Sequence, residues 1–156
     1  MEYILSEKNK QECIFCQELS HPDGPQNLIV HRGRRAFVIL NRYPYTSGHV
    51  MIVPMDHQPS LEYLDAETRS EIMELTTKAL VVLRNEYRPH GFNVGINIGE
   101  AAGAGVLDHV HMHVVPRWSG DTNFMASLAG ARVLPESLED TYARILRAWK
   151  GDSSSI

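Results

Sequence analysis

The sequence predicts an α+β fold: an antiparallel sheet of about five strands with one long crossover helix and a C-terminal helix. Two observations carry this prediction. Short apolar segments with brief links between them, at 27–32, 36–41 and 48–54, are typical of neighbouring antiparallel strands. A long stretch of helical apolar spacing, from 65 to 89, then separates them from further segments in which polar and apolar residues alternate.

The first part of the chain supplies three of the predicted strands. The residues "RGRR" form the expected hairpin turn between the first two, and Pro54 ends the third. The segment "CIFCQEL", which precedes them, is expected to be a short turn or helix.

The long helix is expected to begin after Asp65, a good N-cap residue, and to stop before Pro89 and Gly91. Its apolar positions at helical spacing are Ile72, Thr76, Ala79, Leu80, Leu83 and Tyr87. A second stripe at helical spacing, near the C-terminus, is typical of core packing. Its members are Leu138, Tyr142, Ile145, Leu146 and Trp149.

Two more strands are predicted between these helices. In "FNVGINIG" the apolar residues from Phe92 to Ile98 alternate with polar residues and glycine, which predicts a half-buried strand. The glycine-rich segment 99–105 is a flexible loop, and the strand "HVHMHVV" follows. Pro116 has no N–H to donate, so we expect it to end that strand or to put it at an edge of the sheet.

Length and composition indicate one globular domain, 1–150, and a disordered tail, 151–156. No apolar run approaches the length that spans a membrane, and the charged N-terminus lacks the apolar core of a signal peptide. The net charge of −4 argues against a broad nucleic-acid surface. Without an export signal, Cys13 and Cys16 are expected to be thiols or metal ligands, and the protein to be cytoplasmic.

Three histidines, at 109, 111 and 113, alternate with apolar residues in the last predicted strand. Residues two apart share a face of a strand, so we expect the imidazoles on one face and Val110, Met112 and Val114 on the other. The outer two histidines of a straight strand lie roughly 13 Å apart, too far for all three to bind one ion. The pattern therefore favours different roles for the three histidines over a polar strand face without chemistry.

The glycines at 99, 103 and 105 directly precede these histidines. They fit neither a dinucleotide-binding motif, because Asp108 stands where a further glycine is needed, nor a P-loop, which needs a lysine. A glycine-rich turn whose N–H groups approach an anion remains. A neutral imidazole nitrogen is a competent nucleophile toward phosphorus, and neighbouring donors stabilise the charge that develops.

The segment "HVHMHVV" resembles the signature of the histidine triad family of nucleotide hydrolases and transferases. "CIFC" and "LNRYPYTSGHVMIVPMDH" also resemble segments of bacterial members, so the resemblance covers most of the chain. It implies that His111 is the nucleophile that takes up the nucleotidyl group and that His113 binds phosphate. It further implies the family's fold and a homodimer. The supporting positions that it implies are His49, Asn41 near the nucleoside and Asn97 near the phosphate.

In the zinc-bearing members of this family, the first histidine is a metal ligand. By resemblance, the ligand set here is Cys13, Cys16, His57 and His109. Two thiolates and two imidazoles suit a closed, tetrahedral structural zinc site. The alternative is a pair of buried free cysteines and an unrelated surface histidine.

The chain departs from the commoner branches of the family just before the triad. Gly105 and Val106 stand where those branches carry Gln and then Ser or Thr, so the hydroxyl that helps a leaving group is missing. The segment from Gly103 to Trp118 and beyond resembles instead the branch that cleaves diadenosine tetraphosphate, which includes phosphorylases. By this resemblance, Gly103, Gly105 and Trp118 are candidate substrate-binding residues, and Asp121 and Asn123 follow the same pattern.

The function that follows is nucleotidyl transfer at the α-phosphate of dinucleoside polyphosphates, with a covalent nucleotidyl-histidine intermediate. The acceptor, phosphate or water, stays open. One alternative is a nucleoside phosphoramidase or mononucleotide hydrolase, against which the missing hydroxyl at Val106 argues. The other is a nucleotide sensor without catalysis, against which the intact His111 argues, because a sensor needs no nucleophile. The expected partner is a small nucleotide, not a nucleic acid or a membrane.

Overall fold

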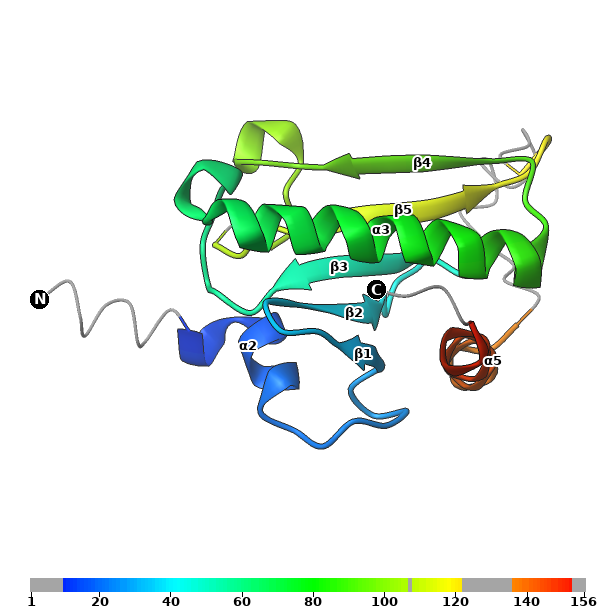
Figure 1. Ribbon diagram of the computed structural model, residues 1–156. Coiled ribbons are helices and arrows are strands. Elements are labelled where there is room, and N and C mark those ends of the chain that lie inside the picture. The colour runs from blue at the N-terminus through cyan, green and yellow to red at the C-terminus, as the bar shows by residue number, and fades with distance from the viewer. Residues whose placement is uncertain (1–9, 107, 122–135, 153–156) are drawn as a thin grey trace, which may run out of the picture.

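The computed structural model describes residues 10–106, 108–121 and 136–152. A five-stranded sheet in the order β1-β2-β3-β5-β4 forms its centre, and every neighbouring pair of strands is antiparallel. In Figure 1 the strands are stacked from β1 at the bottom to β4 at the top. The strands are β1 (Ile29–Arg32), β2 (Ala36–Leu40), β3 (Val50–Pro54), β4 (Gly91–Ile96) and β5 (Met112–Arg117). The predicted α+β class is confirmed.

The long crossover helix is α3 (Ala66–Tyr87), and it lies across the sheet against β2, β3 and β5 (Figure 1). It begins as predicted: the side chain of Asp65 accepts a hydrogen bond from the Thr68 N–H. It ends where Arg88 adopts a left-handed conformation with φ of 48°. The residues that α3 buries are Thr68, Ile72, Leu75, Thr76, Lys78, Ala79, Val82 and Leu83.

The C-terminal helix is α5 (Leu138–Gly151), which packs on α3 and β1. Tyr142, Ile145 and Trp149 of the predicted stripe are buried, and the Tyr142 hydroxyl donates to the carbonyl of Ile29. Because α5 includes Gly151, the helix extends into the segment expected to be a tail; residues 153–156 lie outside the described ranges. The division into one domain and a tail stays a prediction.

The outermost strand, β4, is less buried than its alternation predicts. Phe92 and Ile96 are only half-buried, whereas Val94 is 45% exposed and Ile98, just past the strand, is 41% exposed. The physical reason is position: α3 packs on the inner strands, and β4 is an edge strand with β5 as its neighbour. Alternation alone does not distinguish an edge strand from a half-buried inner one.

Strand β5 starts later than predicted and continues one residue past Pro116, so the proline does not end the strand, although only β4 pairs with β5 at this position. β5 lies between β3 and β4, but β3 pairs with it only from Met112 to Val114. The Pro116 carbonyl accepts from the hydroxyl of Thr46. In an extended residue the nitrogen faces the same side as the carbonyl. Pro116 therefore turns its missing N–H toward the side where β3 has already ended.

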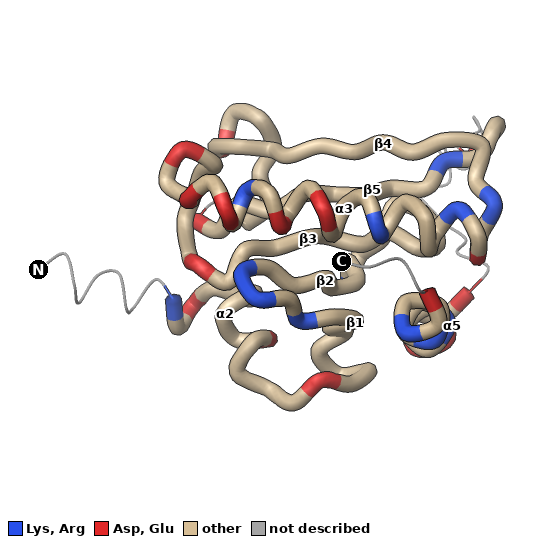
Figure 2. The backbone as a smooth tube through the Cα atoms, viewed as in Figure 1, with Lys and Arg blue, Asp and Glu red and all other residues tan. Residues whose placement is uncertain are grey.

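Charged groups fasten the β1–β2 hairpin to the start of α3, where basic and acidic residues lie side by side in Figure 2. The Glu71 carboxylate accepts from the backbone N–H groups of Arg34, Arg35 and Ala36 at 3.2, 2.5 and 2.6 Å. The Arg35 side chain also pairs with Asp65 at 2.9 Å. In the part of the chain that the structure describes, no helix is long and apolar enough to cross a membrane.

Candidate active site and metal centre

The three histidines do not share the straight strand that their alternation predicts. β5 begins at Met112, so only His113 lies within it, while His109 lies in a bend and His111 directly precedes the strand. His109 and His111 are buried and His113 is half-buried. Helix α2 (Ile14–Leu19) packs against the first two: its Phe15 ring lies 5.4 Å from the His109 ring and 4.9 Å from the His111 ring, between centroids.

His109 belongs to a cluster of four metal-ligand side chains. Its Nδ1 lies 3.4 Å from Cys13 Sγ and 3.7 Å from Cys16 Sγ, and His57 Nδ1 lies 3.4 Å from Cys16 Sγ. All four ligand atoms lie within 4.8 Å of one another. A tetrahedral ion with Zn–S and Zn–N bonds of ordinary length separates its S and N ligands by about 3.5 Å. The four side chains therefore fit around one such ion.

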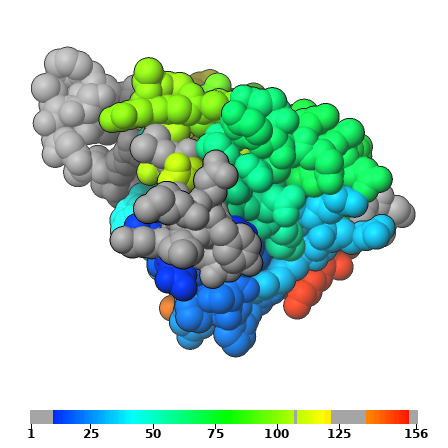
Figure 3. Space-filling model, turned by 90° about the vertical axis from the view of Figure 1, so that its left-hand side faces the viewer, coloured from blue at the N-terminus to red at the C-terminus, as the bar shows by residue number. Residues whose placement is uncertain are grey.

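Backbone hydrogen bonds bring the parts of this cluster together. The Val110 N–H donates to the carbonyl of Gln58 at 2.8 Å, which holds the segment after β3 against the start of the triad. His109 Nε2 lies 2.8 Å from the carbonyl of Pro54. Figure 3 shows this end of the molecule, where the segment with α2, the segment before α3 and the 97–106 loop gather.

The Pro54 carbonyl also fixes the tautomer of His109. A carbonyl only accepts, so Nε2 of His109 holds the proton and Nδ1 turns its lone pair toward the two sulfurs. Burial lowers the pKa of His109 to about 4, which keeps the ring neutral. Burial, with a contribution from Cys13, raises the pKa of the Cys16 thiol to about 11. A metal ion would have to displace that thiol proton on binding.

The other two histidines line a pocket of about 560 Å³. Apolar side chains from α2, β2, β3 and the residue before β1 make much of its wall, namely Ile14, Phe15, Leu28, Ile39, Leu40 and Met51. Asn41 and Asn97, both expected near a ligand, line the pocket as well. A largely apolar cleft with a few convergent polar groups is the usual form of a small-molecule site.

His111 presents one specific nitrogen to this pocket. Its Nδ1 lies 3.0 Å from the backbone carbonyl of His109. Because the carbonyl accepts, Nδ1 carries the proton and the lone pair stays on Nε2. Burial lowers the pKa of His111, so the ring is neutral at pH 7 and this lone pair is available.

His113 is in the other tautomer, with a protonated Nε2, and its hydrogen bond with His49 determines this. The Nδ1 of buried His49 accepts from the Tyr45 N–H at 3.2 Å, so His49 carries its proton on Nε2 and donates it to His113 Nδ1 at 2.9 Å. His113 is left with its proton on Nε2. Burial lowers the pKa of His113 to about 4. The pocket thus has one imidazole acceptor beside one imidazole donor.

The glycine-rich segment borders the same pocket through Gly103 and Gly105. Its N–H groups are partly used within a short 3-10 helix, Glu100–Ala102: the Gly103 N–H donates to the Glu100 carbonyl at 3.0 Å. The Gly103 N–H is thus already hydrogen-bonded, and the approach of other N–H groups of this turn to an anion stays a prediction. Val106, half-buried, also lines the pocket and offers no hydroxyl there.

Two candidate substrate-binding residues do not line this pocket: buried His49, which is linked to it through His113, and Trp118. At about 3.3 Å per residue Trp118 lies about 16 Å along the chain from His113. Its N–H donates to Asp121, whose carboxylate also pairs with Arg117, so this segment is a structured turn after β5. Asn123 lies outside the described residues.

The sequence prediction missed several pocket residues, among them Phe15, Glu18, Arg42 and Tyr43. For the α2 pair a signal exists: in a helix, residues three apart lie on one side, so Phe15 and Glu18 face the same way. Tyr43 and Tyr45 are 81% and 59% exposed. Two aromatic residues close to Asn41 in the sequence are a weaker indication that this turn borders a ligand site.

Comparisons with known proteins agree with this geometry. The family model described as HIT domain matches residues 24–120. The chain is 42% identical over 132 residues to AP-4-A phosphorylase of Mycobacterium tuberculosis, covering 85% of this chain and 68% of that one. It is 30% identical to adenosine 5'-monophosphoramidase of Candida albicans, covering 67% and 70%.

Among solved structures, the chain resembles a Zn-bound histidine triad family protein from Mycobacterium smegmatis. The TM-score is 0.72 at 27% identity, and the match covers 90% of this chain and 95% of that one. The family model, the two sequence relatives and this structure point the same way as "HVHMHVV" and its buried site. The chain belongs to the histidine triad (HIT) family.

Proposed function

We propose that this protein is an enzyme of nucleotidyl transfer that acts at the α-phosphate of dinucleoside polyphosphates, with the nucleotidyl group held on His111. One observation carries the proposal: the hydrogen bond from His111 Nδ1 to the His109 carbonyl leaves the Nε2 lone pair for the pocket. An unprotonated imidazole nitrogen is a competent nucleophile toward phosphorus.

The reaction has two displacements. In the first, Nε2 of His111 bonds to the α-phosphorus while the bond to the bridging oxygen breaks, and the polyphosphate leaves with the electron pair. In the second, an oxygen of the acceptor bonds to this phosphorus, the P–N bond breaks and its electron pair returns to Nε2. The acceptor oxygen loses its proton. From diadenosine tetraphosphate, phosphate as acceptor yields ADP and ATP, whereas water yields AMP and ATP.

His113 serves both displacements as a donor. Its Nε2–H can donate to the phosphate oxygens on which charge develops, and the hydrogen bond from His49 keeps it in that tautomer. His49 acts through His113 and is a positioning residue. Asn97, in the pocket lining, is suited to the phosphate, and Asn41 to the nucleoside.

The leaving group is a polyphosphate rather than an amine. Val106 provides no hydroxyl to protonate a leaving group, and a polyphosphate leaves well without one, whereas an amine does not. This argues against the phosphoramidase alternative. The identity to AP-4-A phosphorylase supports phosphate over water as the acceptor. The cytoplasmic location that the sequence indicates stays a prediction.

The metal held by Cys13, Cys16, His57 and His109 is a structural zinc ion in this proposal. The donor set of two sulfurs and two imidazole nitrogens is the one that zinc prefers, and four protein ligands leave no open position. A Zn-bound family member with the same fold supports this assignment.

The protein is further proposed to be a homodimer that pairs through β4. This strand is an edge of the sheet, and among the described strands only β5 is its neighbour. Val94 on it is 45% exposed. An unprotected edge strand is a surface on which a second strand can add.

His111→Ala is expected to lower kcat by on the order of 10⁴-fold or more, because it removes the bond-forming atom. His113→Ala should cost less, since it removes a donor. Steady-state rates with diadenosine tetraphosphate measure both, and circular dichroism checks the fold. His90→Ala, at an exposed histidine, is the control. Normal turnover by a well-folded His111→Ala variant would refute the mechanism.

Turnover of diadenosine tetraphosphate is expected to rise with phosphate concentration and to yield ADP and ATP. The measurement is product analysis by ion-exchange chromatography over a phosphate titration. A rate independent of phosphate, with AMP and ATP as products, would make the protein a hydrolase. Faster cleavage of a nucleoside phosphoramidate than of the tetraphosphate would contradict the argument from Val106.

The purified protein is expected to hold one zinc ion per chain, measured by elemental mass spectrometry. Cys16→Ser should lower this content and reduce Tm by roughly 5–10 °C before it changes the rate of the remaining folded enzyme, because the ion stabilises the fold. Metal-free protein with an unchanged Tm would exclude a structural zinc site.

Light scattering is expected to give twice the chain mass of 17.6 kDa. Val94→Lys should shift the protein toward monomer, because two like charges then meet at the shared edge. Met73→Lys, at an exposed position on α3, is the matched control and should stay dimeric. A Val94→Lys variant as dimeric as wild type would place the interface elsewhere.

A further inference from the structure

One acidic side chain in the pocket wall is left without a good hydrogen-bond partner. Glu18 on α2 lines the pocket, and its side chain is only 18% exposed. Within the described residues its ion-pair partner is Arg42, with 3.7 Å between Nη2 and Oε1, beyond hydrogen-bond distance. The same Nη2 donates to the carbonyl of Gln26 at 2.8 Å. A largely buried carboxylate with so weak a partner is an acceptor that a ligand can satisfy.

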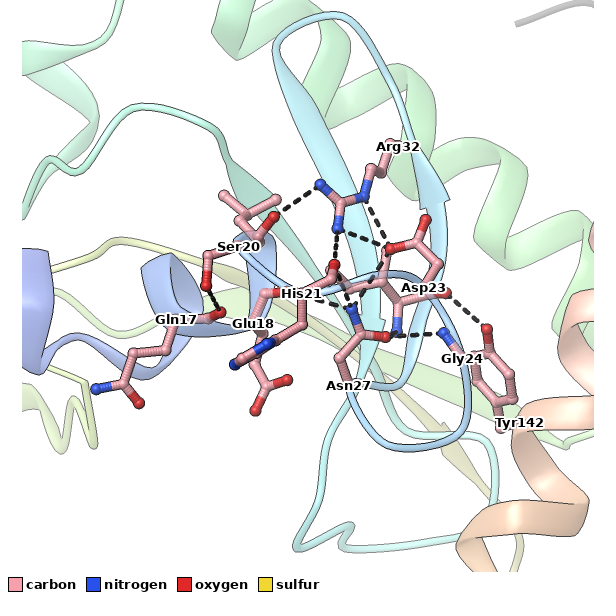
Figure 4. Close-up of polar contacts among 11 residues, drawn as sticks. Gln17, Glu18, Ser20, His21, Asp23, Gly24, Asn27, Arg32 and Tyr142 are labelled. Carbon is pink, nitrogen blue, oxygen red and sulfur yellow. Dashed lines mark hydrogen bonds and ion pairs between the residues drawn. The ribbon is translucent and has the colours of Figure 1, made fainter.

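The polar groups around Glu18 are, by contrast, already committed. Asn27 also lines the pocket, but its Oδ1 accepts from the N–H groups of Gly24 and Ile29, and its Nδ2 donates to the Glu18 carbonyl at 3.2 Å. Arg32 donates to the carbonyls of Leu19 and His21 and pairs with Asp23. These contacts hold the loop after α2 in place. Figure 4 shows this network, with the Glu18 side chain directed away from it.

A row of paired residues in the sheet gives the direction in which the pocket extends from the triad. His113 lies opposite Met51, Met51 opposite Ile39, and Ile39 opposite Ile29, which makes one row across four strands. Neighbouring strands are about 4.8 Å apart, so the row extends about 14 Å from the triad. Met51 and Ile39 are in the pocket wall.

Helix α2 runs over the pocket in the same direction. Phe15 contacts His111, and Glu18 lies one turn farther on, toward Arg42 and the start of β1. A nucleoside 5'-phosphate whose phosphorus lies at His111 would have space for its base along the apolar wall, with the base edge toward Glu18 and Arg42.

The chemistry of this pair restricts the base. A carboxylate only accepts hydrogen bonds and a guanidinium only donates them, so a matching base edge carries an N–H beside an acceptor atom. We propose that Glu18 is the base-specificity residue of this enzyme: it accepts from the 6-amino group of adenine while Arg42 faces a neighbouring ring nitrogen. A 6-oxo purine held in this same register places a carbonyl oxygen opposite the carboxylate, which repels it, and its N1–H opposite the guanidinium, which offers no acceptor. This inference rests on the proposed nucleotidyl transfer.

The test compares diadenosine tetraphosphate with diinosine tetraphosphate, which differ by amino against oxo at position 6. Wild type is expected to favour the adenine substrate by about tenfold or more in kcat/KM, because one charged hydrogen bond is lost. Glu18→Gln, whose amide can donate as well as accept, should bring the ratio close to one. The change should fall in KM rather than kcat, because the base lies away from the reacting phosphorus.

Glu74→Gln is the matched control, since it removes one negative charge from an exposed position on α3 and should leave the ratio unchanged. Glu18→Ala, which offers neither donor nor acceptor, should also abolish the preference and replaces Glu18→Gln if that variant does not fold. A ratio that stays at the wild-type value in folded Glu18 variants, or a wild type without preference, would overturn the inference.

Calorimetric binding of AMP and IMP separates this inference from the proposed function. If wild type cleaves neither tetraphosphate, the proposed reaction is wrong, and an AMP preference that disappears in Glu18→Gln still supports the role of Glu18. If wild type cleaves the adenine substrate while both variants bind AMP and IMP with the wild-type ratio, only the inference about Glu18 fails.

Discussion

The site depends on backbone groups that fix each imidazole in one tautomer. His109 donates to the carbonyl of Pro54 and so turns Nδ1 to the cysteines; its own carbonyl then accepts from His111 and leaves Nε2 of that ring for the pocket. One residue thus belongs to the cluster with Cys13, Cys16 and His57 through its side chain and orients the candidate nucleophile through its main chain. Burial complements this arrangement, because it keeps His109 and His111 neutral, which both a ligand and a nucleophile require.

The same arrangement explains why β5 begins at Met112. A regular strand through His109 would point its main-chain groups at neighbouring strands, and the carbonyl of His109 could not accept from a side chain two residues ahead. The bend frees that carbonyl. The ring of Phe15 packs against the rings of both histidines. The irregular backbone is therefore a requirement of the site.

The sequence predicted structure correctly where a residue type or spacing is typical of a single structural role. Asp65 as a helix cap, the stripe of α5 and the spacing of Cys13 and Cys16 are of this kind, and the fold class and the four metal-cluster residues followed from such patterns or from family resemblance. The sequence was uninformative where neighbours in space decide. The exposure of β4 depends on which strands α3 covers, and the passage of β5 through Pro116 depends on where β3 ends. Glu18 could not be predicted as a pocket residue, because its place there depends on the packing of α2.

Helix α2 has six residues, too few to be stable by itself in water. Its position is therefore set by what it is attached to: the cysteines at its start on one side, and the loop around Asn27 at its end. Phe15 and Glu18, which border the pocket, move with it. An ion between the two sulfurs and a ligand in the pocket would both act on these six residues, and any effect of one on the affinity for the other would be reciprocal. A change in the oxidation state of the two sulfurs would reach the pocket through this one turn and a half of helix.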